Sequence, residues 1–336
     1  MKNQFSLTTL IFFFFISFVN GQQIHTPAEI YKIMEKSPIS YELNELKEVI
    51  TPPDRSENLN YNHYYRAIEN NSIVTYKYNI SDSAKIWLSK AEKHFNNREF
   101  SLARDYYIKT LEVDSTYFYV MTYIGQTYGI QKQWDKAIEW YQKTIKLNYI
   151  DYMAHWFLAD AYKVNGEIEK ALDEITIAFI LNRNNPRIKK SLDEIYKLNK
   201  LKYNEWTFTP QMKIDSVGIN KVKISFDIDW LGYAMVKALW EYEPGYRESM
   251  GVGKGSFSTI EEKEAFVSLM KPLKKKKIKK NPVFKALYDA VNKEMIDEFI
   301  IFEIVLPEHP FVAYQFDEKF INHIKNYVLT IRGNKK

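Results

Sequence analysis

A period of 34 residues constrains this chain more than any other feature of its sequence. Compared with itself at that spacing, the chain gives three aligned segments, which begin at Ala84, Phe118 and Tyr152. Small residues fall into register in rows, and large residues align between them. The small rows are Ala91, Gly125 and Ala159, then Ala103, Ala137 and Ala171, then Thr110, Thr144 and Ala178. Such a unit cannot bury its apolar face alone, so the period predicts a stack of repeats.

Each segment has the pattern of a helix, a short turn and a second helix. The two helices of a unit must pack antiparallel, and their backbones approach closely only where side chains are small. We therefore expect Gly125 and Ala137 to lie at the contact between the two helices of the second repeat. These rows resemble those of the tetratricopeptide repeat (TPR) family, over residues 84–185. The usual proline at the end of a unit is replaced by Ser115 and Tyr149. The resemblance implies an α-solenoid of three repeats.

A further helix is expected after the third repeat. Beyond Pro186, apolar residues recur at helical spacing with lysines on the other side, which is typical of a capping helix that solvates the end of a stack. The repeats and this helix occupy residues 84–200. The predicted fold class is therefore mainly α, a TPR solenoid followed by a small α-rich α+β domain.

The resemblance also implies a concave groove lined by the first helix of each repeat. Its positions in the first repeat are Lys85, Leu88, Ser89 and Glu92. Thr122 is a further concave position on the second repeat, and the candidate partner-binding residues are Tyr119, Tyr123, Gln126, Met153, Trp156, Phe157 and Asp160. An aromatic floor flanked by polar groups suits an extended peptide or a helix with apolar anchors. It does not match the basic carboxylate clamp of some family members. Two alternatives stay open: an adjoining segment of this chain fills the groove, or the repeats only hold neighbouring domains.

The first residues predict export. One lysine precedes an apolar run from Leu10 to Val19, and small or polar residues follow. The run is too short to span a bilayer, which takes about 20 apolar residues. We therefore expect a signal peptide over residues 1–21, cleaved near Gly21, and a periplasmic or secreted bacterial protein. An uncleaved anchor is the alternative.

The regions on either side of the repeats carry weaker patterns. Residues 22–83 are expected to form an N-terminal helical flank that covers the first repeat, with one helix around Ala28–Lys36 and another over Asn62–Asn70. Residues 201–336 are expected to form one α-rich domain with a few strands, which "WTFTPQMKI" and "KVKISFDID" supply. Ser258 and Glu261 predict a capping box, and Phe299–Leu306 a helix.

Three motifs of that last region carry a candidate function and a structural alternative. The stretch "GVGKGS" lacks the order of a phosphate loop and is expected to be a surface loop. Glu241 and Glu243 lie two residues apart, on different sides of a helix, which favours a packed helix end over an acid–base pair. The lysine run is expected to be a solvated loop that also attracts anionic lipid or polysaccharide; its residues are Lys271, Lys274, Lys275, Lys276, Lys277, Lys279 and Lys280.

Composition narrows the function further. The chain has no cysteine, which excludes disulfides and thiolate chemistry, and its six histidines show no metal-binding spacing. No catalytic motif is present, and we expect no cofactor and no nucleic-acid partner. The predicted function is that of an exported scaffold that binds a protein or peptide partner. The alternatives are an envelope hydrolase or sugar-binding enzyme that uses the C-terminal domain, and a tether to an anionic surface through the lysine run.

Overall fold

The structure, a computed structural model, describes residues 24–335 apart from 56–58, 60–62, 70–71 and 254–257. The contacts within the chain divide it into two compact units. One, here called the α/β unit, contains residues 1–51 and 209–279; the other, here called the solenoid unit, contains residues 52–208 and 280–336. The expected signal peptide, residues 1–21, lies outside the described residues, as does part of "GVGKGS".

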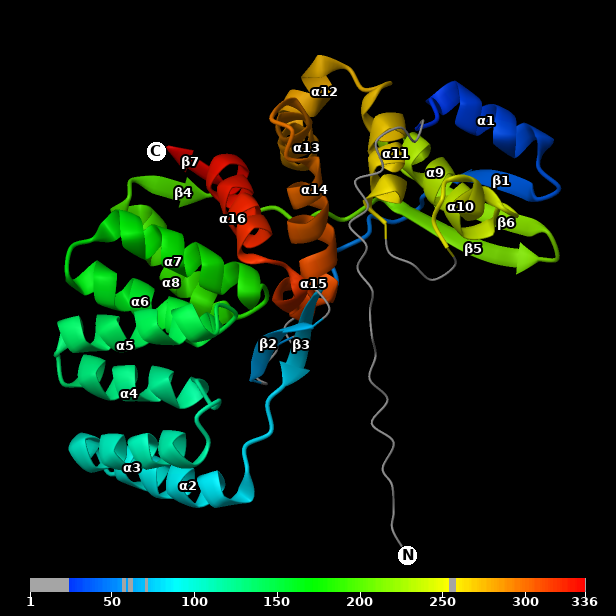
Figure 1. The fold of residues 1–336 in the computed structure, drawn as a ribbon. Helices are drawn as coiled ribbons and strands as arrows, with labels where there is room; N and C mark the ends of the chain where they lie inside the picture. The colour runs from blue at the N-terminus through cyan, green and yellow to red at the C-terminus, as the bar shows by residue number, and fades with distance from the viewer. Residues whose placement is uncertain (1–23, 56–58, 60–62, 70–71, 254–257, 336) are drawn as a thin grey trace, which may run out of the picture. The chain divides into compact units, whose positions relative to one another are not determined.

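Seven helices build the repeat stack of the solenoid unit (Figure 1). They pack in sequence order, each against the next. Their bounds are α2 Asp82–Asn96, α3 Phe100–Val113, α4 Tyr119–Ile130, α5 Trp134–Leu147, α6 Tyr152–Val164, α7 Ile168–Leu181 and α8 Pro186–Leu198. The predicted repeats and capping helix are confirmed. Residues 82–198 thus form a TPR solenoid of three helix pairs and a final helix.

The small residues of the repeats lie where large side chains of the neighbouring helix pack against them. A Cβ on Gly125 of α4 would lie 2.5 Å from the ring of Tyr141 on α5, and one on Gly129 would approach Trp134 and Ala137. Gly125 therefore makes room for a tyrosine, and Gly129 is the residue that faces Ala137. Ala91, Ala103, Ala137 and Ala159 are all fully buried.

The turn inside each repeat also repeats. Arg98, Lys132 and Gly166 each have a positive φ, at 34-residue spacing, and so does Lys200 after α8. The left-handed residue allows the chain to reverse between two helices. The capping helix α8 thus ends in the turn of a fourth repeat, after which the chain continues as strand β4, Leu201–Tyr203, instead of a second helix.

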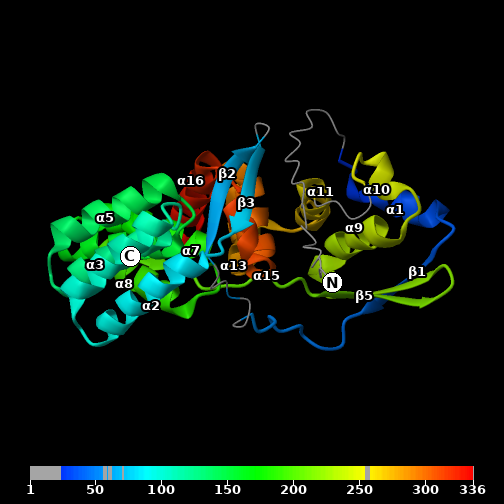
Figure 2. The ribbon, with the colours of Figure 1, turned by 60° about the horizontal axis from the view of Figure 1, so that its bottom comes forward.

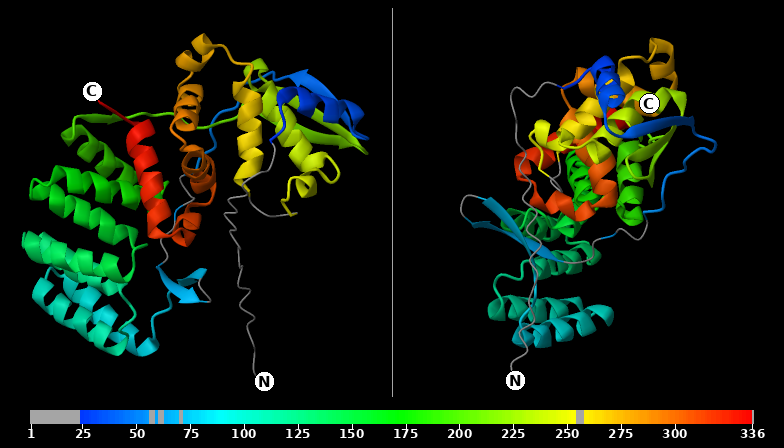
Figure 3. Two further views of the ribbon diagram at one scale, coloured as in Figure 1. Left: turned by 45° about the horizontal axis from the view of Figure 1, so that its top comes forward. Right: turned by 90° about the vertical axis from the view of Figure 1, so that its right-hand side faces the viewer.

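The C-terminal part of the solenoid unit packs against the last repeat. α16, Glu318–Tyr327, lies beside α7, as Figure 3 shows, and the 3₁₀ segment Pro310–Gln315 contacts both α7 and β3. The antiparallel pair β4–β7 joins the last repeat to the C-terminal end of the chain. The other elements are β2 Tyr64–Glu69, β3 Ser72–Lys77, α13 Pro282–Asn292, α14 Ile296–Phe299, a π-helix Ile300–Val305, α15 Leu306–Glu308, a π-helix Val328–Arg332 and β7 Gly333–Lys335.

The α/β unit is built on a three-stranded sheet of order β1-β6-β5, with α9 across one face (Figure 2). β1 pairs parallel with β6, Tyr41 opposite Val222, and β5 pairs antiparallel with β6. Val222, Ile224, Ala234 and Ala238 form its core. The elements are α1 Pro27–Lys36, β1 Ser40–Glu45, β5 Met212–Gly218, β6 Lys221–Phe226, α9 Leu231–Tyr242, α10 Tyr246–Ser249, α11 Thr259–Met270 and α12 Lys275–Lys280.

Several expectations differ from the structure. The helix predicted over Asn62–Asn70 is wrong: Tyr64–Glu69 is a strand, because both arms of the β2–β3 hairpin are rich in aromatic and β-branched residues, which favour strands. Residues 22–83 are therefore not a helical flank: α1 is the helix found there, and the described residues up to 51 belong to the α/β unit. Residues 201–336 do not form one domain, since the chain passes to the other unit after residues 208 and 279. Ser258 caps α11 through the backbone N–H of Ile260, while Glu261 pairs with Lys237 and Arg247, so the capping box does not form.

Candidate partner-binding site

The first helices of the repeats line one face of the stack. α4 contacts α6, and α6 contacts α8, so these helices lie side by side along that face. The residues of the first repeat contribute little apolar surface: Lys85, Ser89 and Glu92 are exposed, and Leu88 is half-buried against the core. Burial nevertheless raises the pKa of Glu92.

Tyrosines form the floor on the second repeat. Tyr119 is buried, and its hydroxyl contacts the sulfur of Met153 on α6. Tyr123 is half-buried, stands edge-on to Tyr119 at 4.9 Å between ring centroids, and stacks on Tyr107 of α3. Burial raises the pKa of Tyr119 and Tyr123, so both hydroxyls stay neutral. Gln126 is half-buried one turn further along, and Thr122 is fully buried.

The third repeat contributes the largest rings. Trp156 donates its indole N–H to Ser191 of α8 at 2.9 Å, and its ring lies 5.6 Å from that of Phe157. Both rings are half-buried, and Phe157 also contacts Tyr141. Asp160 is paired with Lys163 at 2.8 Å. The bond to Ser191 fixes the orientation of an indole that keeps part of its surface accessible.

A second row of residues at 34-residue spacing is polar and is not among the residues predicted from the sequence. Asp114, Asn148 and Asn182 end the second helices of the three repeats and stand 34 residues apart. Asp114 accepts a hydrogen bond from Tyr78, and Asn148 donates to the backbone oxygen of Tyr64 at 2.8 Å. Near the third turn, Asn184 donates to Pro307 at 2.8 Å. The spacing that revealed the small rows would also have revealed this polar row.

Residues 63–78, which carry the β2–β3 hairpin, pack against these turns. Tyr78 stacks on Tyr117 at 4.7 Å between centroids, and the ring of His63 lies on that of Tyr119. On the other side, Arg66 and Thr75 both donate to the backbone oxygen of Tyr314, each at 2.9 Å. An adjoining segment of the chain therefore covers the Tyr119 end of the predicted groove, and Tyr119 is not a free groove residue.

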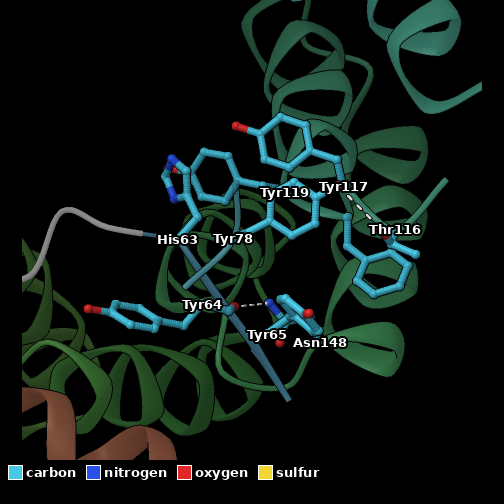
Figure 4. A pocket seen from close by; sticks show the side chains of 9 residues that line it. His63, Tyr64, Tyr65, Tyr78, Thr116, Tyr117, Tyr119 and Asn148 are labelled. Carbon is cyan, nitrogen blue, oxygen red and sulfur yellow. Dashed lines mark hydrogen bonds between the residues drawn. The ribbon is translucent and has the colours of Figure 1, made fainter. Parts of the chain in front are cut away.

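Two small pockets remain where the hairpin meets the stack. His63, Tyr64, Tyr119 and Asn148 line both of them. Figure 4 shows the first, with the Asn148 side chain reaching the backbone of Tyr64. Each leaves about 10 Å³ of free space, close to that of one water molecule. Neither has room for a substrate of drug size.

The expectation of a loop over the lysine run is wrong for its second part, whereas residues 271–274 form a turn and an irregular segment. Lys275–Lys280 is a short helix, because Ile278 turns inward and is only 8% exposed. Lys277 pairs with Asp229. The other six lysines of the run are exposed: Lys271, Lys274, Lys275, Lys276, Lys279 and Lys280. The run therefore presents its charge to solvent from a turn and the short helix that follows it.

The carboxylates of the α/β unit serve its packing. Glu243 accepts hydrogen bonds from Ser37 and Tyr41 of the first residues, and not from a second acid. Glu264 is fully buried and accepts from the backbone N–H of His25, from Trp240 and from Tyr246, at 2.7 to 2.9 Å. Across the described residues, no cluster of His, Asp or Glu has the arrangement of a metal site. Within the same ranges, no helix combines the length and apolar character that a membrane span needs.

Comparison with known proteins concerns the repeats. No family model matches the sequence, and no curated protein matches it. Among solved structures, the first TPR of Spaghetti (RPAP3), bound to an HSP90 peptide, covers 35% of this chain and 94% of its own, at 21% identity and TM-score 0.34. The Yersinia enterocolitica type III secretion chaperone SycD, in complex with a YopD peptide, covers 36% of this chain and 96% of its own, at 20% identity and TM-score 0.33. A MamA structure covers 70% of this chain and 97% of its own, at 15% identity and TM-score 0.32. At these identities and TM-scores the likeness supports no conclusion about the function of this chain.

Proposed function

We propose that this chain is an exported scaffold protein that holds a peptide segment of a protein partner on the concave face of its repeats. The observation that carries the proposal is the pair of half-buried rings on α6, Trp156 and Phe157. The hydrogen bond from Trp156 to Ser191 orders the indole, so binding costs it little conformational entropy. Large, ordered aromatic side chains carry most of the energy of such contacts.

The groove proposed here is shorter than the one expected from sequence. Its open part consists of Tyr123, Gln126, Met153, Trp156, Phe157 and Asp160, since Tyr119 lies beneath His63. Its polar edge is acidic only in part, because Lys163 neutralises Asp160. An apolar or aromatic anchor of the partner fits this surface better than a strongly charged one.

Capture of the partner from the envelope of the exporting organism tests the proposal. Trp156→Ala is expected to weaken binding by about 2 kcal/mol or more, which is the size of a hot-spot effect. Trp140→Ala, on the second helix α5, is the matched control that removes an indole elsewhere in the stack. The proposal fails if both variants bind the partner equally, or if Trp156→Ala loses binding only by unfolding.

A second function is proposed for the lysine run, as a contact for an anionic surface. The supporting observation is that α12 is folded with Ile278 inward and its lysines outward. Replacing Lys274, Lys275, Lys276 and Lys277 with glutamine should abolish binding to phosphatidylglycerol vesicles and remove its salt dependence. Equal vesicle binding by both forms at low salt would contradict it.

A further inference from the structure

The second pocket beside the hairpin is lined by buried polar groups, whereas a packing defect is ordinarily lined by apolar side chains. We propose that it binds a primary ammonium group, from a lysine side chain or an α-amino terminus of the peptide partner. The residues that matter are His63, Tyr64, Tyr119, Asn148, Asp151 and Tyr314, here called the tyrosine pocket. The inference rests on the proposed function only in assigning the ammonium group to that partner.

The first argument is charge. Asp151 is 5% exposed and begins α6, where its carboxylate accepts from the N–H groups of Met153 and Ala154 and from the hydroxyl of Thr122. All three donors are neutral. Among the described residues, Asp151 forms no ion pair within 4 Å; His155 is the charged group that acts on it, and both its ring nitrogens are engaged elsewhere, with Glu174 and with the backbone oxygen of Tyr149. Buried carboxylates are ordinarily paired with a cation, so the pocket has a place for one.

The second argument is the unused hydrogen-bonding capacity. Asn148 and Tyr314 are 8% and 2% exposed. The amide oxygen of Asn148 and the hydroxyl of Tyr314 are buried without a partner in the part of the chain that the structure describes. The amide nitrogen of Asn148 is already used by Tyr64, so its oxygen is free to accept. A primary ammonium group brings three donors and no acceptor, which matches these groups.

The third argument is the wall. Rings of Tyr64, Tyr119 and Tyr314 surround the space, and aromatic faces attract cations by their quadrupoles. The free space of about 10 Å³ admits a group the size of water. An ammonium group has that size, whereas a trimethylated one is too large. Burial lowers the pKa of His63 to about 4, so the pocket holds no competing positive charge near neutral pH.

Other occupants fit less well. An anion would meet the Asp151 carboxylate without a positive group to receive it. A bare metal cation prefers a shell of about six oxygen ligands, and the pocket offers fewer, since the Asp151 oxygens are shared with three donors. Water satisfies Asn148 and Tyr314 but adds no positive charge next to Asp151, which has no ion-pair partner within 4 Å among the described residues.

The experiment measures the binding of three C-terminally amidated tripeptides to the purified chain by ligand-observed NMR. Acetyl-Gly-Lys-Gly-amide offers only a side-chain ammonium, Ala-Gly-Gly-amide only an α-amino group, and acetyl-Gly-norleucine-Gly-amide offers neither. We expect at least one of the first two to bind, and at least tenfold more tightly than the norleucine peptide; the stronger of the two identifies the source. Equal binding by all three overturns the proposal, as does full displacement of the bound peptide by potassium chloride but not by tetramethylammonium chloride.

Asp151→Asn is the decisive variant. Asn185 occupies the equivalent position 34 residues later and caps α8 in the same way, so asparagine is compatible with this helix start. The substitution should weaken the ammonium peptide at least tenfold, whereas Asp160→Asn, which removes the same charge from the groove, should not. Equal affinities of Asp151→Asn and the unaltered chain overturn the pocket.

The two proposals can fail separately. If Trp156→Ala loses the partner while the lysine and norleucine peptides bind alike, the groove stands and the pocket falls. If the lysine peptide binds through Asp151 but Trp156→Ala captures the partner undiminished, the pocket stands and the groove falls. Tyr314→Phe, which removes one unpartnered hydroxyl and keeps the ring, should weaken binding of the ammonium peptide, whereas Trp156→Ala should leave the affinity for that peptide unchanged.

Discussion

The repeat stack and the α/β unit are held together in opposite ways. In the stack, each helix packs against the next along the chain, and the same small residues return every 34 positions. In the α/β unit, the third strand of the sheet comes from a distant part of the sequence: β1 pairs with β6, with Ser40 opposite Lys221. Local packing spreads the stability of the stack over interchangeable contacts, whereas the α/β unit depends on a few contacts between segments far apart in the sequence.

The largest expected effect breaks one such distant contact. Glu264→Ala should lower the free energy of unfolding of the α/β unit by about 3 kcal/mol or more, because the donors of His25, Trp240 and Tyr246 lose their buried acceptor. Hydrogen exchange should show loss of protection in α9 and α11 and none in α4 and α6. Glu264→Gln, which keeps an acceptor, is the control and should cost less.

A uniform loss of protection across both units would contradict this prediction. It would mean that the units unfold as one, so that the distinction between local and distant stabilisation has no thermodynamic consequence.

The next effect is set within the stack. Ala137 is fully buried between the helices of the second repeat, so Ala137→Phe should overpack that contact and cost about 1–3 kcal/mol. Protection should fall in α4 and α5 and, more weakly, in the neighbouring repeats, while α9 and α11 keep theirs. An unchanged denaturation midpoint would show that the helices do not meet at Ala137.

The period explains why the stack could be predicted from sequence. Each repeat contacts only its neighbours, so the same contact recurs in every repeat. An aligned row such as Ala103, Ala137 and Ala171 therefore gives three independent signs of one contact. The positive φ of the turn residues Arg98, Lys132 and Lys200 could not be predicted from sequence, because arginine and lysine, unlike glycine, have no preference for that conformation. Of the groove, the sequence predicted which residues lie on the first helices, and that face is where Trp156 and Phe157 stand.

The regions outside the period gave no comparable repetition. Residues 40–45 contain too few apolar residues to predict a strand. Their partner strand β6 lies far along the chain, so the local sequence pattern could not predict how the α/β unit is built. The cover over Tyr119 was missed for a similar reason: His63 lies in a segment that was predicted as a helix. The tyrosine pocket draws on residues from 63 to 314, and no local motif marks it.

The smallest expected effect is a pH dependence at the junction of hairpin and stack. Burial lowers the pKa of His63 to about 4, below the usual 6.5, so the folded state binds fewer protons than the unfolded chain between those values. Stability from this group is present above pH 6.5 and is lost as the pH falls towards 4. Between pH 7.5 and 5.5 the loss is about 1 kcal/mol.

Asp151 acts in the other direction and must be separated from His63. Burial raises the pKa of Asp151 to about 6, so its contribution grows as the pH falls through that value and is lost as the pH rises. His63→Phe keeps a ring on Tyr119 and removes only the histidine titration. Relative to the unaltered chain, it should therefore gain about 1 kcal/mol on going from pH 7.5 to 5.5, measured by urea unfolding followed at the solenoid unit. The same change in Asp151→Asn should have the opposite sign. If the stability of His63→Phe changes with pH in parallel with that of the unaltered chain, His63 is protonated without cost in the folded state. The hairpin then leaves the stack readily, and its packing, unlike that of the repeats, contributes little to the free energy of unfolding.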